Sequence, residues 1–257
     1  MLPLRDENPT RRVPVITVLL ILANIAVYFL VQPEAEDIGA STRFSLERAA
    51  IPCEVVENRP LSIGELQQTF ERGDDTACQG DDPVGPPLFP GKQVLLAVVT
   101  SMFLHGSLLH LGGNMLFLWI FGNNVEDRLG PVPYLLFYFG AGVVATVAHI
   151  AVQPDSTVPV VGASGAVAGV MGAYLVWFPN APILALIFIL FREIRAKWLL
   201  LFWLALQFVE PFNPNSGVAW VAHVGGFVFG VVVGLVVRAA GGGASRAPLP
   251  TYGSPYR

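Results

Sequence analysis

Residues 217–237 have the sequence GVAWVAHVGGFVFGVVVGLVV, an apolar run in which His223 is the only ionisable side chain. About 20 apolar residues suffice to cross the hydrocarbon core of a bilayer as a helix. Gly226, Gly230 and Gly234 follow at intervals of four and place small residues on one helix face, where a neighbouring helix can approach closely. An ionisable group inside a span marks a candidate functional site, because its burial there is costly. This stretch therefore predicts a membrane helix that contributes a side chain to a functional site.

Five further apolar runs have the character of membrane spans. They are 15–31, 107–122, 132–152, 160–178 and 196–209. The composition agrees, with 53% apolar and 13% charged residues, whereas charged residues make up about a quarter of a typical soluble domain. We therefore predict an all-α membrane protein with six transmembrane helices.

Two shorter apolar runs, 94–104 and 181–191, are too short to cross a bilayer. The first predicts a re-entrant or interfacial element. The second fits the same description, or belongs to the fifth span. The run at 15–31 is expected to be a retained helix, because it is longer than a typical signal-peptide core and no A-x-A-like cleavage site follows it directly.

The distribution of basic residues predicts the orientation. Basic residues lie before span 1, between spans 2 and 3, between spans 4 and 5, and after span 6. They are Arg5, Arg11, Arg12, Arg128, Arg192, Arg195, Lys197 and Arg238. The loops 153–159 and 210–216 contain none. By the positive-inside rule, the N-terminus (1–14) and the tail (239–257) are cytoplasmic, and the tail has the composition of a disordered segment.

Residues 32–92 then form an extracytoplasmic insert within a helical domain that covers 15–238. The insert has twelve Asp or Glu against five Lys or Arg, and it contains Cys53 and Cys78. In an oxidising compartment these cysteines could form a disulfide, and two unpaired thiols fit the sequence equally well. The net charge of −4 and the lack of a basic tract argue against a nucleic-acid partner.

Three polar side chains fall at a similar depth in spans that run in the same direction. Asn114, Ser164 and His223 lie seven, about four and six residues into their spans, or about 6–11 Å below the outer surface at 1.5 Å of rise per residue. A serine hydroxyl becomes a good nucleophile when a neighbouring base takes its proton, and histidine suits that task near neutrality. The sequence therefore predicts Ser164 as nucleophile and His223 as general base, although a lone serine or histidine in a span is more often structural.

The surroundings of Ser164 fit this chemistry. The turn Gly162-Ala163-Ser164-Gly165 lies at a predicted helix start, where free N–H groups can stabilise an oxyanion. His110 and Asn114 are four apart, on one helix face, and both offer donors.

The remaining histidines fit other roles. His105 lies where a loop enters the membrane, and His149, near the outer end of span 3, is expected to be structural. No HExxH motif or pair of cysteines within the spans suggests a metal site, so neither metal nor cofactor is predicted.

These features resemble the rhomboid family of intramembrane serine proteases, in its bacterial six-helix form, over about 92–238. Five motifs carry the resemblance, in the family's order. They are HGSLLH from His105, His110-xxx-Asn114, Gly122-xxx-Glu126-xxx-Gly130, Gly162-Ala163-Ser164-Gly165 and Ala222-His223-xx-Gly226-xxx-Gly230.

The resemblance implies a six-helix bundle whose first loop is partly embedded in the membrane, and a Ser–His dyad that acts through an acyl-enzyme. It implies that His110, Asn114 and the Ser164 N–H form an oxyanion hole. His105, Glu126, Gly162, Gly226 and Gly230 are expected to be structural, with Glu126 in a cytoplasmic loop. Span 5 is expected to be the lateral gate.

The function implied by the resemblance is a serine endopeptidase in a bacterial plasma membrane. It would cleave single-span or other membrane protein substrates at a site open to the extracytoplasmic side. The alternatives are an inactive relative that binds transmembrane clients, which would usually lack the Ser or the His, and a small transporter, which would show broken repeats. At Ala168 the chain departs from many members, which carry a Tyr packed on the catalytic His, so other groups must orient this imidazole. The substrate and the oligomeric state do not follow from the sequence.

Overall fold

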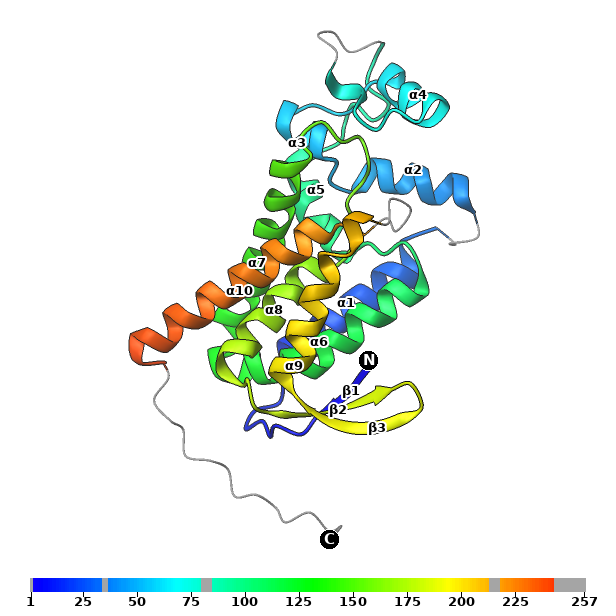
Figure 1. Cartoon of the computed structure of the whole chain (residues 1–257). Coiled ribbons are helices and arrows are strands. Elements are labelled where there is room, and N and C mark those ends of the chain that lie inside the picture. The colour runs from blue at the N-terminus through cyan, green and yellow to red at the C-terminus, as the bar shows by residue number, and fades with distance from the viewer. Residues whose placement is uncertain (1, 34–36, 80–84, 213–217, 243–257) are drawn as a thin grey trace.

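The computed structural model describes residues 2–33, 37–79, 85–212 and 218–242. Most of this chain is helical, and Figure 1 shows the longer helices gathered in one bundle, with smaller helices at one end and three strands at the other. Six helices of the bundle follow the order of the six expected spans. They are α1 (Val15–Leu30), α6 (Leu108–Leu129), α7 (Pro131–Val152), α8 (Ser164–Trp177), α9 (Ala196–Gln207) and α10 (Trp220–Val237).

Two of the described helices are long and apolar enough to cross a membrane on their own, α7 and the helix that continues from Trp220 to Gly241. The short helix α5 (Val94–Thr100), extended by η2 (Ser101–Phe103), meets α6 at 80°, and this bent pair adds a third if it is counted as one span. The helices α1, α8 and α9 have 16, 14 and 12 residues, and 14 residues rise only about 21 Å against a hydrocarbon core of about 30 Å. The prediction of a mostly helical chain with membrane-crossing helices is confirmed, whereas helix length does not establish six spans.

The prediction of an all-α chain is wrong in one respect, because three strands form an antiparallel sheet. They are β1 (Leu2–Asp6), β2 (Pro182–Ile187) and β3 (Leu190–Arg195), in the order β1-β2-β3. The apolar run 181–191 therefore lies in a hairpin and is not part of α9, whereas its position as a re-entrant or interfacial element stays a prediction. The N-terminal segment supplies the third strand, with Leu2 opposite Leu186.

The N-terminal strand is attached to the bundle through Asp6. Its carboxylate accepts hydrogen bonds from Tyr174 Oη at 2.7 Å and from Asn124 Nδ2 at 2.5 Å. Burial raises the pKa of Asp6 to about 6, although these bonds oppose the shift. At the other terminus, Arg238–Gly242 forms a turn of π-helix where the tail was expected to be disordered, and the rest of the predicted tail, 243–257, lies outside the described residues.

The expectation that Glu126 lies in a loop is also wrong, because α6 continues to Leu129. The Glu126 carboxylate accepts hydrogen bonds from Ile16 N (2.9 Å), Thr17 N (2.8 Å) and Thr17 Oγ1 (2.8 Å). These N–H groups belong to the first turn of α1, where no intrahelical acceptor exists. Glu126 therefore holds the start of α1 against the end of α6.

The described part of the insert is folded. It contains α2 (Ile38–Arg48), α3 (Pro52–Glu57), α4 (Ile63–Arg72) and the 3-10 turn η1 (Ala77–Gln79). Its small core surrounds a disulfide between Cys53 and Cys78, so the structure selects the first of the two possibilities for these cysteines. The other core residues are Leu46, Ile51, Leu61 and Leu66.

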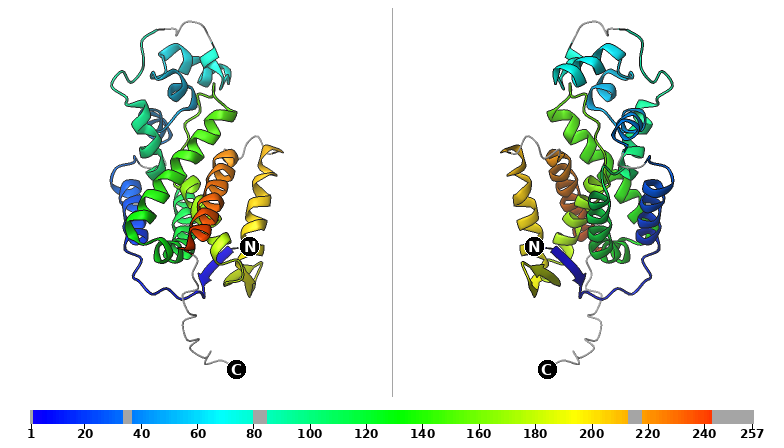
Figure 2. Two further views of the ribbon diagram at one scale, coloured as in Figure 1. Left: turned by 90° about the vertical axis from the view of Figure 1, so that its left-hand side faces the viewer. Right: turned by 90° about the vertical axis from the view of Figure 1, so that its right-hand side faces the viewer.

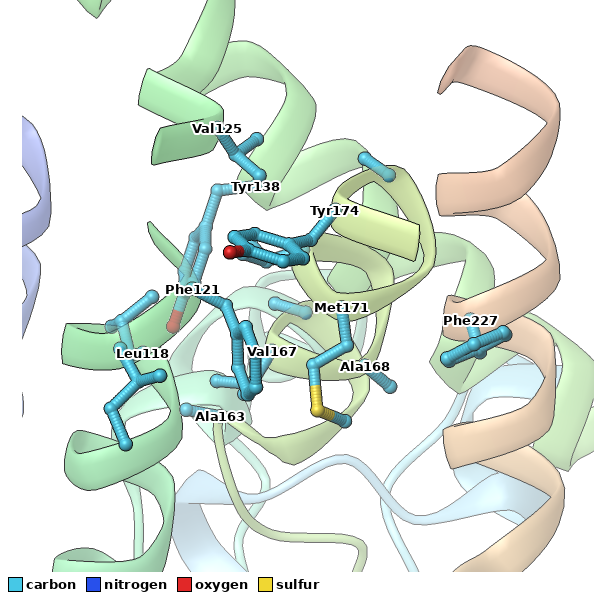
Figure 3. Packing of buried hydrophobic residues seen from close by; sticks show 14 of the residues in the cluster. Leu118, Phe121, Val125, Tyr138, Ala163, Val167, Ala168, Met171, Tyr174 and Phe227 are labelled. Atoms are coloured by element: carbon cyan, nitrogen blue, oxygen red, sulfur yellow. The ribbon is translucent and has the colours of Figure 1, made fainter. Parts of the chain in front are cut away.

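The core of the bundle is centred on α8, which contacts α6, α7, α9 and α10. Every residue of α8 from Gly165 to Tyr174 is buried. Figure 3 shows Met171 and Tyr174 of this helix beside Phe121 of α6, and the Phe121 and Tyr174 rings meet edge to face at 5.0 Å. In contrast, α9 stands at the edge of the bundle in both views of Figure 2.

Candidate active site

The helices α8 and α10 are in direct backbone contact. A Cβ on Gly226 would overlap the carbonyl oxygen of Gly165, and one on Gly230 would overlap that of Gly169. Only glycine fits at these positions, because any side chain would separate the two backbones. The small-residue face expected on α10 is therefore the face that meets α8.

This contact brings Ser164 and His223 together. Ser164 is the first residue of α8, and His223 lies in the first turn of α10. The Oγ of Ser164 is 2.8 Å from Nε2 of His223, which is hydrogen-bond distance. Because Ser164 begins its helix, its backbone N–H has no intrahelical acceptor and is free to meet a ligand. The pair thus combines a hydroxyl, a base and a helix N-terminus at one place.

Gly162 shapes the turn before Ser164. Its φ of +123° is a conformation that side-chain-bearing residues rarely adopt, and a Cβ here would lie 2.8 Å from the His110 ring. Its N–H donates to the carbonyl of Ser101 at 2.9 Å. The glycine therefore allows the turn before Ser164 and the His110 ring to lie side by side.

His110 and Asn114 lie on the first two turns of α6, and the His110 ring borders Gly162. Asn114 is buried, and its Nδ2 has no hydrogen-bond partner among the described residues. A buried amide donor without a partner is unusual and costly unless a ligand completes it. Asn114 Nδ2 is therefore available to donate a hydrogen bond to a ligand.

The ring of His105 packs against the ring of His110. The two rings meet edge to face with centroids 5.0 Å apart, and His105 is buried. Its backbone N–H and carbonyl bond the side chain of Gln32, both at 3.0 Å. These contacts tie the loop between η2 and α6 to the end of α1, which is a structural arrangement.

Two other candidates from the sequence make no hydrogen bond to the pair within the described residues. His149 is buried in α7, and within the described residues no hydrogen bond or ring contact joins it to Ser164 or His223. Glu126 is bonded to the start of α1, as described above.

Potential metal ligands gather at one place in the described part of the chain, Cys53, Glu65 and Cys78 in the insert. The two sulfurs are bonded to each other, and Glu65 pairs with the guanidinium of Arg59 at 2.6 and 3.0 Å. This group is engaged in holding the insert together and lies outside the Ser164 site.

Two residues of α9 that the sequence did not single out contact His223. Gln207 Oε1 lies 2.7 Å from His223 Nδ1, and the centroid of the Trp203 ring lies 5.7 Å from that of the imidazole. Gln207 could have been found by the criterion that selected Asn114, since it is the one polar side chain in the apolar run LLLFWLALQFV. The face that α9 turns to the bundle could not be read from that run, because apolar residues surround the whole helix.

Comparison with known proteins places these features in one family. The model of the Rhomboid domain matches residues 92–240. The chain is 28% identical over 155 residues to rhomboid protein 1, mitochondrial, of Saccharomyces cerevisiae, which covers 56% of this chain and 42% of that protein. It is 31% identical over 145 residues to the presenilin-associated rhomboid-like protein, mitochondrial, of Bos taurus, which covers 55% and 38%. It is 38% identical over 78 residues to the rhomboid protease GluP of Bacillus subtilis, which covers 30% and 15%.

In each case the chain covers less than half of the curated relative's length. The domain match nevertheless covers more than half of this chain, and its apolar helices make the chain an integral membrane protein. On this match, the chain belongs to the rhomboid family.

Proposed function

We propose that the protein is an intramembrane serine endopeptidase with Ser164 as nucleophile and His223 as general base. The observation that carries the proposal is the 2.8 Å separation of Ser164 Oγ and His223 Nε2 at the contact of α8 and α10. The names of two relatives from Bacillus subtilis, a rhomboid protease and a putative rhomboid protease, agree with it. The presence of both the serine and the histidine argues against an inactive relative.

In the proposed reaction, His223 Nε2 takes the proton of Ser164 Oγ while Oγ attacks the scissile carbonyl carbon. Asn114 Nδ2, the His110 ring and the Ser164 N–H donate to the resulting oxyanion. His223 then returns the proton to the leaving amine, which leaves an acyl-enzyme. A water molecule, deprotonated by His223, attacks the ester, and collapse of the second oxyanion frees Ser164.

The membrane arrangement is part of the proposal. All six bundle helices cross the bilayer, the shorter ones where the membrane is locally thinner, and both termini face the cytoplasm, as the charged loops indicate. The insert and the Ser164 end of α8 then lie on the extracytoplasmic side of a bacterial plasma membrane. Single-span membrane proteins are the proposed substrates, and they would enter past α9 at the edge of the bundle.

The experiment is cleavage of a fluorescent single-span substrate by the purified protein in detergent. We expect Ser164→Ala and His223→Ala to abolish cleavage, since loss of either residue costs roughly 10⁶-fold in a soluble serine protease. A fluorophosphonate probe should label Ser164 and no other serine. Full cleavage by either variant would refute the dyad. Failure of the intact, folded protein to cleave or to react with the probe, together with binding of the substrate, would favour the inactive client-binding protein.

A further inference from the structure

The His223 imidazole has a partner on each of its two nitrogens. Ser164 Oγ lies 2.8 Å from Nε2, and Gln207 Oε1 lies 2.7 Å from Nδ1. A neutral imidazole carries its single N–H on one nitrogen or the other, and only an unprotonated Nε2 can accept the serine proton. The partner on Nδ1 therefore decides whether His223 can act as a base.

The orientation of the Gln207 amide follows from its second hydrogen bond. Its Nε2 donates to the backbone carbonyl of Trp203 at 3.1 Å. If the amide were turned around, its oxygen would face that carbonyl, and two acceptors would oppose each other. Oε1 therefore faces His223, and because an amide oxygen only accepts, the proton must sit on Nδ1. This is the tautomer in which Nε2 offers its lone pair to Ser164.

The position of Gln207 shows why α9 carries a polar side chain here. Gln207 is 6% exposed, whereas its neighbours Leu206 and Phe208 are 44% and 54% exposed. A buried amide costs free energy unless its groups are hydrogen-bonded, and both the oxygen and the nitrogen of Gln207 are. Burial thus directs the amide at His223, while the apolar neighbours face outward.

Helix α9 also gives His223 an aromatic neighbour, which α8 does not supply at position 168. Ala168 on α8 is fully buried and too small to reach the imidazole. The Trp203 ring lies 5.7 Å from the imidazole centroid, one helical turn before Gln207. Rotation of the ring about χ2 is therefore restricted from α9, by one hydrogen bond and one aromatic neighbour.

We propose that Gln207 is a positioning residue for the reaction, which holds His223 in the tautomer and orientation that accept the Ser164 proton. The proposal rests on the proposed function of Ser164 and His223. During the reaction Nδ1–H stays on His223 and keeps donating to Oε1. That bond strengthens when Nε2 gains its proton, because a charged donor makes a stronger hydrogen bond.

The test compares Gln207→Met with Gln207→Glu in the cleavage assay. Met keeps the length of the side chain and removes the acceptor, so kcat should fall roughly 10- to 100-fold with KM nearly unchanged, since a hydrogen bond to a charged group is lost. Glu restores an acceptor, so kcat should recover, and the acidic limb of the pH–rate profile should move to higher pH, because a carboxylate beside Nδ1 stabilises the protonated imidazole. Leu136→Ala, at an exposed position of α7 and outside the proposed entry past α9, is the control and should cleave like the original protein.

The outcomes separate positioning from a structural role. If Gln207→Met unfolds at lower temperature but its folded fraction keeps the original kcat, the residue is structural and the proposal is overturned. An unmoved pH profile in Gln207→Glu overturns it as well, even if Gln207→Met cannot be purified. If Ser164→Ala still cleaves, the proposed function fails first. If Ser164→Ala is inactive and both Gln207 variants match the original protein, only the positioning role fails.

Discussion

Among single residues, Asn114 gives the clearest test of the proposed oxyanion site, because its buried Nδ2 has no partner among the described residues. We expect Asn114→Leu to lower kcat by about 10²–10³, the usual cost of one lost oxyanion donor. Thermal stability should stay the same or rise, since no hydrogen bond of that nitrogen is lost and an amide is removed from an apolar setting. Initial-rate kinetics and thermal unfolding in detergent measure the two effects.

Asn24 is the matched control for this substitution. It is fully buried in α1, and its Nδ2 donates to the carbonyl of Leu20 at 2.8 Å. Asn24→Leu should therefore change stability without a selective loss of kcat. An Asn114→Leu protein with the original kcat would remove Asn114 from the oxyanion site.

For single residues, the sequence could indicate which side chains are neighbours only in apolar runs that contain few polar groups. Ser164 and His223 could be predicted to meet because each stands beside small residues in an otherwise apolar run, and glycine faces imply close helices. Gln207 could not be paired with His223, because its partner depends on the rotation of α9, and an evenly apolar helix gives no periodic signal for that rotation.

Among the elements, the contact of α8 with α10 determines how the proposed dyad of Ser164 and His223 is arranged. Gly230→Ala would place a methyl group against the backbone of Gly169, where no flexible side chain can move aside. We expect the two helices to separate, with a loss of about 1–3 kcal/mol in the free energy of unfolding. Cleavage should fall as well, since Ser164 and His223 reach each other only across this contact. Unfolding in detergent and the cleavage assay test this prediction.

Gly112→Ala is the control, because Gly112 is exposed on α6 and a Cβ there meets nothing within 4 Å. Alanine favours a helix over glycine by about 1 kcal/mol, so this variant should be as stable as the original protein or more so. Equal stability of Gly230→Ala and Gly112→Ala would show that the backbone contact contributes nothing.

The sequence allowed some helices to be predicted but did not reveal the strands. Long apolar runs mark helices such as α7 and α10 clearly, because length alone separates them from strands. The hairpin of β2 and β3 was not foreseen, since an 11-residue apolar run suits a buried helix and a strand equally. Its pairing partner β1 lies about 180 residues away in the sequence, so no local pattern reveals the sheet.

At the scale of the whole molecule, the insert holds the loop that leads to Ser164. Among the described residues, three backbone hydrogen bonds join the insert to this loop. They run from Cys53 N to Ser156 O, from Thr157 N to Asp75 O and from Val160 N to Ala50 O, at 2.8–3.1 Å. Ser101 adds a bridge, because its Oγ accepts from Ala50 N at 2.6 Å while its carbonyl accepts from Gly162 N. These hydrogen bonds connect the folded insert to the turn that precedes Ser164.

We expect the disulfide that closes the insert to affect the proposed cleavage through these hydrogen bonds. Cys53 and Cys78 are 25 residues apart, and loss of a cross-link over such a loop costs roughly 3–4 kcal/mol in the chain-entropy account. We expect the Cys53→Ser, Cys78→Ser double variant to expose the insert to protease and to cleave the membrane substrate more slowly. A reducing agent should reproduce both effects in the original protein and cause no further change in the double variant, which controls for other actions of the reagent. If the insert becomes protease-sensitive while cleavage keeps its rate, then the Ser164 turn is ordered by the bundle alone, through Gly162 and the glycine contact, and the insert serves another purpose.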